Sequence, residues 1–226
     1  MKNAFEEIPK NKGFEEQFRN IEQFDVAGGK AEVVDIKLAD EPKTDVPLFL
    51  APAWACTVET YKPVLETLAE TDRRVLGINH PRFGGDMSTA PEEAVNNYSF
   101  EELRKALNII DVIKQKDIEK VDVITHSEGA INTAIAAMLH PEKFRNIVFY
   151  APAGLIGEDT FTRLLKGFSQ QSKPAESLAD IKIDDETTNA AWEALKYLAK
   201  NPVRGIKETI DVSNSQIHDV IRYLHE

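Results

Sequence analysis

Residues 125–129 read Thr-His-Ser-Glu-Gly and carry the side chains best suited to chemistry. Ser127 sits between an apolar run, Val121–Thr125, and an alanine-rich run, Gly129–Leu139. A serine held in a sharp turn between a strand and a helix exposes its hydroxyl for nucleophilic attack. The free N–H groups and the positive dipole end of the helix behind it would stabilise an oxyanion. The alternative is a structural role, in which Ser127 only caps the helix.

The same five residues resemble the nucleophile elbow, G-x-S-x-G, with Thr125 at the first glycine position and Gly129 at the second. An elbow needs small neighbours because its helix must approach the preceding strand closely. Gly129 and Ala130 meet that need, whereas Thr125 is bulkier. The five-residue pattern is common by chance, so its weight comes from its context, a strand before it and a helix after it.

Strand-like and helix-like runs alternate from residue 46 to residue 150. Four short apolar runs are typical of strands buried on both faces: residues 46–50, 74–78, 121–125 and 146–150. Segments with helical spacing of apolar residues separate them, and one opens with a capping box at Ser99 and Glu102. This order predicts an α/β fold with a mostly parallel sheet and helices on both faces.

Both ends of the chain depart from this alternation. Phe18–Asp25 and Ala31–Ala39 flank a glycine-containing turn at residues 27–29, so we expect an N-terminal antiparallel hairpin. After Gly154 the strands stop, apart from a weak candidate at 181–183, and helices are expected at 164–168, 190–198 and 217–224. We therefore expect a core over residues 1–154 and a helical, cap-like segment over residues 155–226.

Composition excludes several classes of partner. The 226 residues hold 27 Lys+Arg and 38 Asp+Glu, a net charge of −11, so we expect no nucleic-acid partner and no anionic membrane surface. No apolar run approaches the roughly 20 residues of a membrane span, and Met1–Gly13 is too polar for a signal peptide. The single Cys56 cannot form an internal disulfide, so a cytoplasmic protein is expected. Phosphate-binding glycine motifs and metal-ligand spacings do not occur, so neither a cofactor nor a metal is expected.

Over residues 18–155 the chain resembles the α/β-hydrolase family. Pro52-Ala53-Trp54-Ala55 follows the first parallel strand, where the family carries its oxyanion loop, with Pro and Ala replacing the usual His and Gly. Residues 79–84 are similar to the family's D-x-P-G-x-G loop, and residues 150–154 to the segment that leads into a cap. The resemblance implies that Ser127 is the nucleophile and that the backbone N–H groups of Trp54 and Glu128 form the oxyanion hole. It also implies that the Trp54 side chain and His126 lie at the substrate pocket; the alternative for Trp54 is a core aromatic.

In this family the catalytic acid and histidine follow the serine in the chain, after the seventh and eighth strands. No strand-like run follows Tyr150, so we expect these last core strands, with the acid and the base, to be absent. The apolar strand at 146–150 would then be an edge, which natural proteins seldom leave bare, so we expect an N-terminal portion of a longer hydrolase. Among substitutes for the missing groups, His80 fits a pocket-lining residue better than a base, Asp159 would still need a histidine, and Cys56 suits a small buried residue.

Three functions remain open. The first is a serine hydrolase with little or no activity in this chain, acting on a carboxylic ester or a related acyl or carbon–carbon bond. Its substrate would be a small, apolar, ester-like molecule under a cap, whose apolar residues could line the pocket. These residues are Phe161, Leu164, Leu165, Phe168, Trp192 and Leu195, and plain helix packing is the alternative that we favour for most of them. The second is a non-catalytic binding module of the same fold that lacks the Asp–His pair. The third is an α/β fold without chemistry; the oligomeric state stays open in all three.

Overall fold

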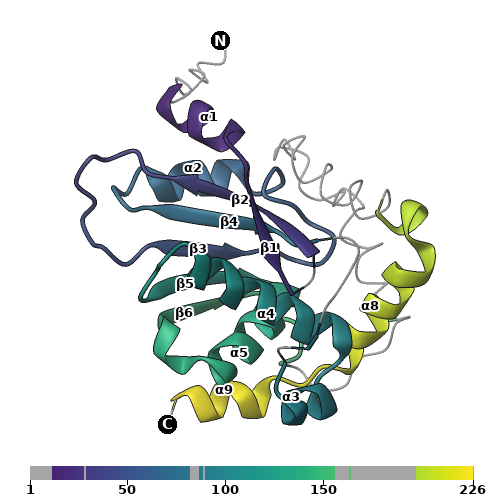
Figure 1. Cartoon of the computed structure of the whole chain (residues 1–226). Coiled ribbons are helices and arrows are strands. Elements are labelled where there is room, and N and C mark those ends of the chain that lie inside the picture. The colour runs from purple at the N-terminus through teal and green to yellow at the C-terminus, as the bar shows by residue number, and fades with distance from the viewer. Residues whose placement is uncertain are drawn as a thin grey trace, which may run out of the picture.

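The computed structural model describes residues 12–27, 29–81, 87–88, 90–155, 163 and 197–225, without the side chains of Lys12 and His225. Within these residues six strands form one sheet in the order β1-β2-β4-β3-β5-β6 (Figure 1). In chain order the strands are β1 Glu22–Val26, β2 Gly29–Ile36, β3 Leu48–Ala51, β4 Val75–Asn79, β5 Val121–His126 and β6 Phe144–Tyr150.

The sheet is mixed. Strand β3 pairs in parallel with β4 and β5, and β5 pairs in parallel with β6. Strand β2 pairs antiparallel with β1 and with β4. The mostly parallel sheet with an N-terminal antiparallel hairpin is thus confirmed, and β3 is buried at every position, as an apolar run between two helical layers must be.

Helices cover both faces of the sheet, as the alternation predicts (Figure 1). On one face, α1 (Lys12–Arg19) and α2 (Lys62–Ala69) pack through Phe14 and Leu65. On the other face lie α4 (Phe100–Gln115) and α5 (Glu128–Leu139), with Ile109 and Val112 against the strands. The remaining elements are α3 Glu92–Asn97, η1 Pro141–Lys143, α8 Pro202–Asn214 and α9 His218–His225.

The structure corrects three local predictions. Phe18 belongs to α1, where it stacks on Phe14 one turn earlier with ring centroids 5.5 Å apart, because the two apolar residues lie at i, i+4 on one helix face. Only half of the capping box forms: Ser99 Oγ accepts from the Glu102 N–H at 3.3 Å, but the Glu102 carboxylate accepts from Ser215 Oγ. Helix α8 has no counterpart in the prediction, and its contacts shape the site below.

Other predictions lie outside the described residues. These are the helix at 164–168, the strand candidate at 181–183, residues 190–196 of the next helix, Asp159 and the six apolar cap residues. The helix at 217–224 is confirmed as α9, which packs on α5 through Ile217. After β6 the described residues contain no further strand.

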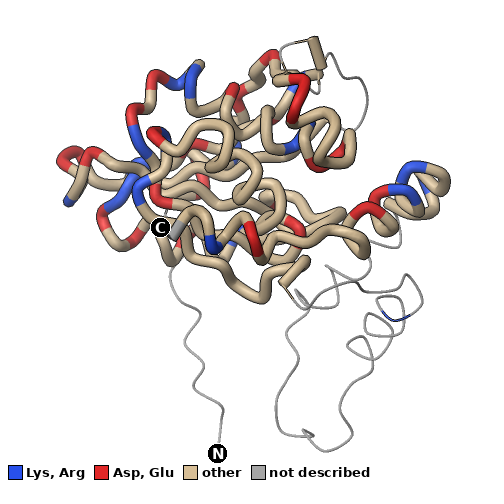
Figure 2. Tube along the Cα trace, turned by 90° about the horizontal axis from the view of Figure 1, so that it is seen from below, with Lys and Arg blue, Asp and Glu red and all other residues tan. Residues whose placement is uncertain are grey.

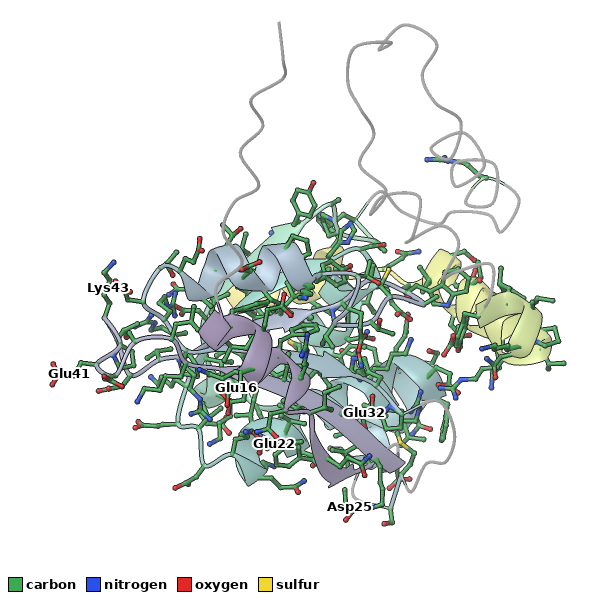
Figure 3. All side chains as sticks on the ribbon, turned by 90° about the horizontal axis from the view of Figure 1, so that it is seen from above. Glu16, Glu22, Asp25, Glu32, Glu41 and Lys43 are labelled. Carbon is green, nitrogen blue, oxygen red and sulfur yellow. The ribbon has the colours of Figure 1, made fainter. Side chains whose placement is uncertain are left out.

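The two edges of the sheet differ in character. Strand β1 carries acidic residues, and Figure 3 shows Glu22 and Asp25 along this edge near Glu32 of β2. Charges on an edge strand oppose pairing with another chain. At the other edge, β6 leaves Val148 56% exposed and Tyr150 65% exposed, so the strand predicted to become an apolar edge is an edge among the described residues.

Charges of both signs are spread over the described chain. Figure 2 shows Lys and Arg interspersed with Asp and Glu, which agrees with an acidic protein that lacks a broad basic footprint. Among the helices of the described part, none is both long and apolar enough to cross a bilayer.

Candidate active site

Ser127 occupies a strained backbone turn between β5 and α5. Its φ is +51° and its ψ is −115°, a combination that residues other than glycine rarely adopt. Backbone hydrogen bonds hold the turn: the Ser127 N–H donates to Tyr150 O at 3.2 Å, and the Ala153 N–H donates to Ser127 O at 3.1 Å. The end of β6 and the residues that follow it therefore hold Ser127 in this conformation.

The Ser127 side chain is half-buried and takes no part in capping α5. Its Oγ forms no hydrogen bond with any residue in the described ranges. The capping alternative consequently has no support, since a capping serine would accept from an N–H of the first helical turn. Glu128 is the first residue of α5, and the first N–H groups of a helix have no carbonyl partner within it.

Close packing between α5 and β3 explains the glycine two residues after Ser127. A Cβ on Gly129 would lie 2.4 Å from Ala51 O and 2.8 Å from Pro52 O. Both contacts are with backbone, so a larger residue would displace the helix from the strand. The bulkier Thr125 is accommodated on the other side, fully buried, with its Oγ1 donating to Val148 O of β6 at 3.3 Å.

Tyr61 joins the loop after β3 to the end of β5. Its hydroxyl accepts from the Ala53 N–H at 2.9 Å and lies 2.7 Å from His126 Nδ1, to which it donates. Burial lowers the pKa of His126, so the ring is neutral at pH 7 with Nδ1 as an acceptor. His126 packs edge-on to Tyr61, with ring centroids 5.8 Å apart. Through Tyr61 it thus supports the loop that is predicted to form the oxyanion hole.

Trp54, in the same loop, is held by α8. Its Nε1 donates to Glu208 Oε2 at 3.1 Å, and its ring meets Tyr197 edge-on with centroids 5.9 Å apart. The Tyr197 hydroxyl donates to the same Glu208 oxygen at 2.6 Å. The loop predicted to form the oxyanion hole is therefore fixed by Tyr61 on one side and by α8 on the other.

A buried lysine connects α8 to the elbow. Lys105 Nζ of α4 lies 2.7 and 2.8 Å from the two carboxylate oxygens of Glu128 and 3.6 Å from Glu208 Oε1. Arg204 of α8 pairs with Glu208 and with Glu101, each at 3.1 Å. Burial lowers the pKa of Lys105, but the carboxylates of Glu128 and Glu208 outweigh burial and raise it. Lys105 therefore stays charged, and removing it would leave the buried carboxylate of Glu128 uncompensated and Glu208 with Arg204 alone.

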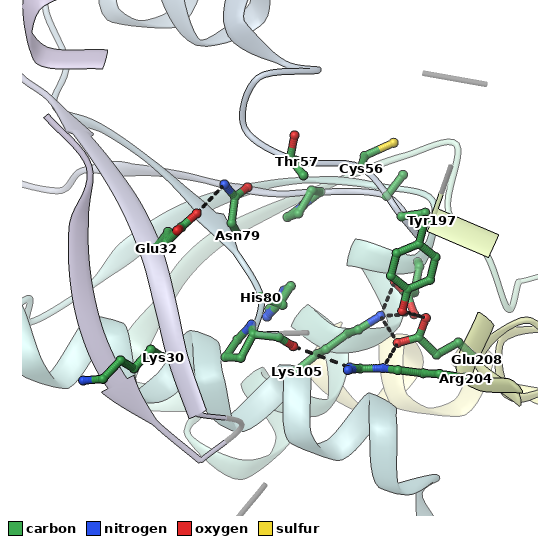
Figure 4. A pocket seen from close by; sticks show the side chains of 15 residues that line it. Lys30, Glu32, Cys56, Thr57, Asn79, His80, Lys105, Tyr197, Arg204 and Glu208 are labelled. Carbon is green, nitrogen blue, oxygen red and sulfur yellow. Dashed lines mark hydrogen bonds and ion pairs between the residues drawn. The ribbon is translucent and has the colours of Figure 1, made fainter. Parts of the chain in front are cut away.

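A cavity of about 270 Å³ lies where these elements meet. Figure 4 shows Asn79 and His80 on one side of it, and Tyr197, Arg204 and Glu208 gathered near the end of Lys105 on the other. The loop after β3 contributes Pro52, Ala53 and Cys56. Within the described part of the chain, the lining includes Glu128 but not Ser127, Trp54 or His126.

Among the described side chains, no histidine bonds the Ser127 hydroxyl. His126 is engaged by Tyr61, and His140 lies near Lys114 and Glu142. His80 contacts Asn108 through Nδ1, and burial, with Lys105, Arg104 and Arg204 nearby, lowers its pKa well below the usual range. Burial also raises the pKa of Cys56 to about 11, which keeps the thiol of this half-buried residue protonated at pH 7 and does not favour a nucleophile.

The sequence prediction missed the residues of α8 that bear on the site. The signals were present: Asn201-Pro202 is a common helix start, and Arg204 and Glu208 are spaced as an i, i+4 ion pair. The apolar residues Val203, Ile206 and Ile210 also have helical spacing, although they are exposed. Nothing in the sequence, however, indicates that Glu208 meets Trp54 and Lys105, which come from two distant segments.

A family model described as the alpha/beta hydrolase fold matches residues 46–196. Since this match covers more than half of the chain, the protein belongs to the α/β-hydrolase fold family. The expected resemblance is confirmed. No match was found among the curated proteins.

Two solved structures with TM-scores above 0.5 agree with this chain at the level of the fold, and a third match is given for the length it covers. A carboxylesterase structure from Nitrososphaera gargenis is 14% identical with a TM-score of 0.58, covering 90% of this chain and 75% of that one. The meta-cleavage product hydrolase of Pseudomonas fluorescens is 18% identical with a TM-score of 0.52, covering 90% and 71%. An alpha/beta hydrolase from Novosphingobium aromaticivorans is 14% identical with a TM-score of 0.48, covering 68% and 50%. The chain thus spans about half to three quarters of these structures.

Proposed function

We propose that Ser127 is the nucleophile of a serine hydrolase that acts on a carboxylic ester, or a related acyl or carbon–carbon bond, in a small molecule. The observation that carries the proposal is the positive φ of Ser127 together with a hydroxyl that no described residue engages. A strained, non-glycine turn persists only where the surrounding structure holds it, and such turns cluster at functional sites. The reaction class fits the family and the predicted elbow.

In the proposed reaction, Ser127 Oγ attacks the carbonyl carbon and the carbonyl electrons move onto its oxygen. The backbone N–H groups of Trp54 and Glu128 stabilise that oxyanion. The serine proton passes to a base and then to the leaving group as the tetrahedral intermediate collapses to an acyl-enzyme. The base of the family is a histidine oriented by an acid, and no described histidine lies in hydrogen-bond contact with Ser127.

We further propose that the segment from residue 155 onward forms a cap over the pocket. Helix α8 supports this, because its Arg204 and Glu208 line the cavity and Glu208 reaches the loop after β3 through Trp54. The Trp54 side chain then acts mainly in holding cap and loop together. His126, predicted at the substrate pocket, is proposed to contribute by supporting the oxyanion loop through Tyr61.

Hydrolysis of an activated ester tests the reaction. A p-nitrophenyl ester has a good leaving group and so depends least on a general acid. We expect hydrolysis by the chain that falls at least about tenfold in Ser127→Ala. Ser88→Ala changes an exposed serine outside the site and serves as the matched control. Equal rates in the chain and in Ser127→Ala would contradict the proposal.

The second candidate is a binding module of the same fold without turnover. It is favoured by one observation, the lack of a histidine at Ser127 among the described residues. Saturable binding of an ester or acid, without Ser127-dependent hydrolysis, would support this candidate over the first.

A further inference from the structure

Glu208 of α8 is a buried carboxylate whose two oxygens face different parts of the site. The side chain is 2% exposed. Its Oε2 accepts from Trp54 Nε1 at 3.1 Å and from the Tyr197 hydroxyl at 2.6 Å. Its Oε1 lies 3.1 Å from Arg204 Nε and 3.6 Å from Lys105 Nζ. Figure 4 shows these cations and the tyrosine meeting at Glu208, so one oxygen holds the loop after β3 and the other faces the charges.

Both residues whose backbone N–H groups form the proposed oxyanion hole lead to this carboxylate. Trp54 does so directly, through its indole. Glu128 does so through Lys105, whose Nζ lies 2.7 and 2.8 Å from the two oxygens of the Glu128 carboxylate. In each residue the anchored side chain and the proposed N–H donor are attached to the same Cα. Fixing the side chain therefore restricts the directions in which the N–H can point.

The charge of Glu208 strengthens both links. Burial raises the pKa of Glu208, but the cations and donated hydrogen bonds around it, with Lys105 the largest, outweigh burial and lower the pKa. The carboxylate is thus ionised at pH 7. Hydrogen bonds to a charged acceptor are about twice as strong as those between neutral groups, so an amide of the same shape would hold Trp54 and Lys105 less firmly.

We propose that Glu208 is a positioning residue that holds the N–H groups of Trp54 and Glu128 in place, so that docking of α8 completes the oxyanion hole. The inference rests on the proposed function, because an oxyanion arises only when Ser127 attacks a carbonyl. Donors stabilise a developing charge only if they are held near their final positions before the reaction. Glu208 acts through Trp54 and Lys105, and the rate of the chemical step then depends on a helix that follows the sheet in the chain.

NMR of the backbone tests the positioning without using the reaction. Glu208→Gln keeps the shape of the side chain and removes its charge. We expect the Trp54 indole proton signal to move upfield and the amide signals of Trp54 and Glu128 to shift and broaden in proton–nitrogen correlation spectra. The amide of Leu65, which donates to Tyr61 O at 2.8 Å within α2, should not move, whereas a general loosening of the fold would affect it too.

Asp211→Asn is the matched control. It makes the same change from carboxylate to amide three residues further along α8, where Asp211 lines a different cavity together with Ser99. We expect the signals of Trp54 and Glu128 to stay as they are in the unchanged chain.

Steady-state hydrolysis of the p-nitrophenyl ester is the second readout. Glu208→Gln should lower the Ser127-dependent kcat at least about tenfold and leave KM within about twofold, since the oxyanion is present in the transition state and not in the bound substrate. Asp211→Asn should leave both constants within about twofold.

Trp54→Phe separates the two links and keeps the test open if Glu208→Gln does not fold. It removes the Nε1 donor and leaves Glu208 charged beside Lys105. The amide signal of residue 54 should shift and broaden while that of Glu128 stays, and kcat should fall a few-fold.

The outcomes distinguish this proposal from the proposed function. Unchanged amide signals of Trp54 and Glu128 in Glu208→Gln, or equal effects of Glu208→Gln and Asp211→Asn on kcat, would overturn the positioning role. Hydrolysis that does not exceed that of Ser127→Ala would instead contradict the proposed function, and the amide signals would still decide whether Glu208 holds the two N–H groups.

Discussion

Two regions of the site differ in what holds them. The first, which we call the floor and define as Ala51, Ser127 and Gly129, lies next to the cavity without lining it and is built from backbone packed against backbone. The second, which we call the roof and define as Tyr197, Arg204 and Glu208, lines the cavity and is built from ionised and hydrogen-bonded side chains around Lys105. Steric packing is insensitive to pH and salt, whereas a buried ion-pair network depends on every member being present and ionised. The floor can thus hold a strained residue, and the roof can respond to conditions.

Removing the lysine under the roof should have the largest effect. Lys105→Met leaves Glu128 buried without its cation and leaves Glu208 with Arg204 alone, and we expect a loss of about 3–5 kcal/mol in the free energy of unfolding at neutral pH. Urea unfolding measures it. Lys120→Met, at an exposed lysine before β5, is the control. A loss equal to that of the control would show that the roof is not held by charge.

Adding a methyl group to the floor should lower the free energy of unfolding somewhat less than the loss of Lys105 does. Gly129→Ala places a Cβ against Ala51 O and Pro52 O, and we expect a loss of about 3 kcal/mol by urea unfolding. Gly77→Ala is the comparison variant, since its Cβ would lie 2.9 Å from Val58 Cγ1 and 3.2 Å from Val34 Cγ2, side-chain atoms that can shift more than backbone, so we expect a smaller loss of about 1–2 kcal/mol. Equal losses in the two variants would mean that the floor is no tighter than the rest of the sheet.

The next largest effect is the pH dependence of stability that comes from Glu102, near the roof. Burial raises the pKa of Glu102, which accepts from Ser215 just beyond α8, to about 7. The folded state then binds the proton more tightly than the unfolded one, so stability from this group is present at low pH and is lost as pH rises. The loss is on the order of 2 kcal/mol between about pH 5 and pH 7.

Glu102→Gln tests this dependence because it keeps an acceptor for Ser215 and removes the titration. Thermal unfolding across the range should show a flatter profile and a more stable variant above neutral pH. Glu93→Gln, on the exposed face of α3, should leave the profile unchanged. An identical slope in Glu102→Gln and the unchanged chain would contradict the assignment.

The smallest expected effect lies at the tyrosine between loop and elbow. Tyr61→Phe leaves the Ala53 N–H and His126 Nδ1 without their shared partner, at a cost of about 1–2 kcal/mol. Ester hydrolysis should fall as well, since the loop carries a proposed oxyanion donor. Tyr223→Phe, at an exposed tyrosine on α9, is the control for both measurements. Full ester hydrolysis by Tyr61→Phe would show that the contact of Tyr61 with this loop does not affect the reaction.

The sequence was sufficient for the floor and insufficient for the roof, and the reason is physical. Ser127 and Gly129 follow directly on strand β5, so the local pattern, with a strand before it and a helix after it, predicts the turn and the need for a small residue, although not the contact with Ala51. The roof joins Trp54, Lys105 and Glu208, which lie far apart in the chain and meet only through tertiary packing. The contact of His80 with Asn108 likewise comes from tertiary packing, which no spacing rule reveals.

The most direct test of the central claim is to map where a fluorophosphonate reacts with the folded chain. Such a reagent forms a covalent bond with a nucleophilic serine, and peptide mass spectrometry locates the adduct. If the turn between β5 and α5 presents Ser127 to an oxyanion hole, one adduct should form on Ser127, vanish in Ser127→Ala and persist in Ser88→Ala. Adducts spread over exposed serines, or none on Ser127 in the folded chain, would contradict the account.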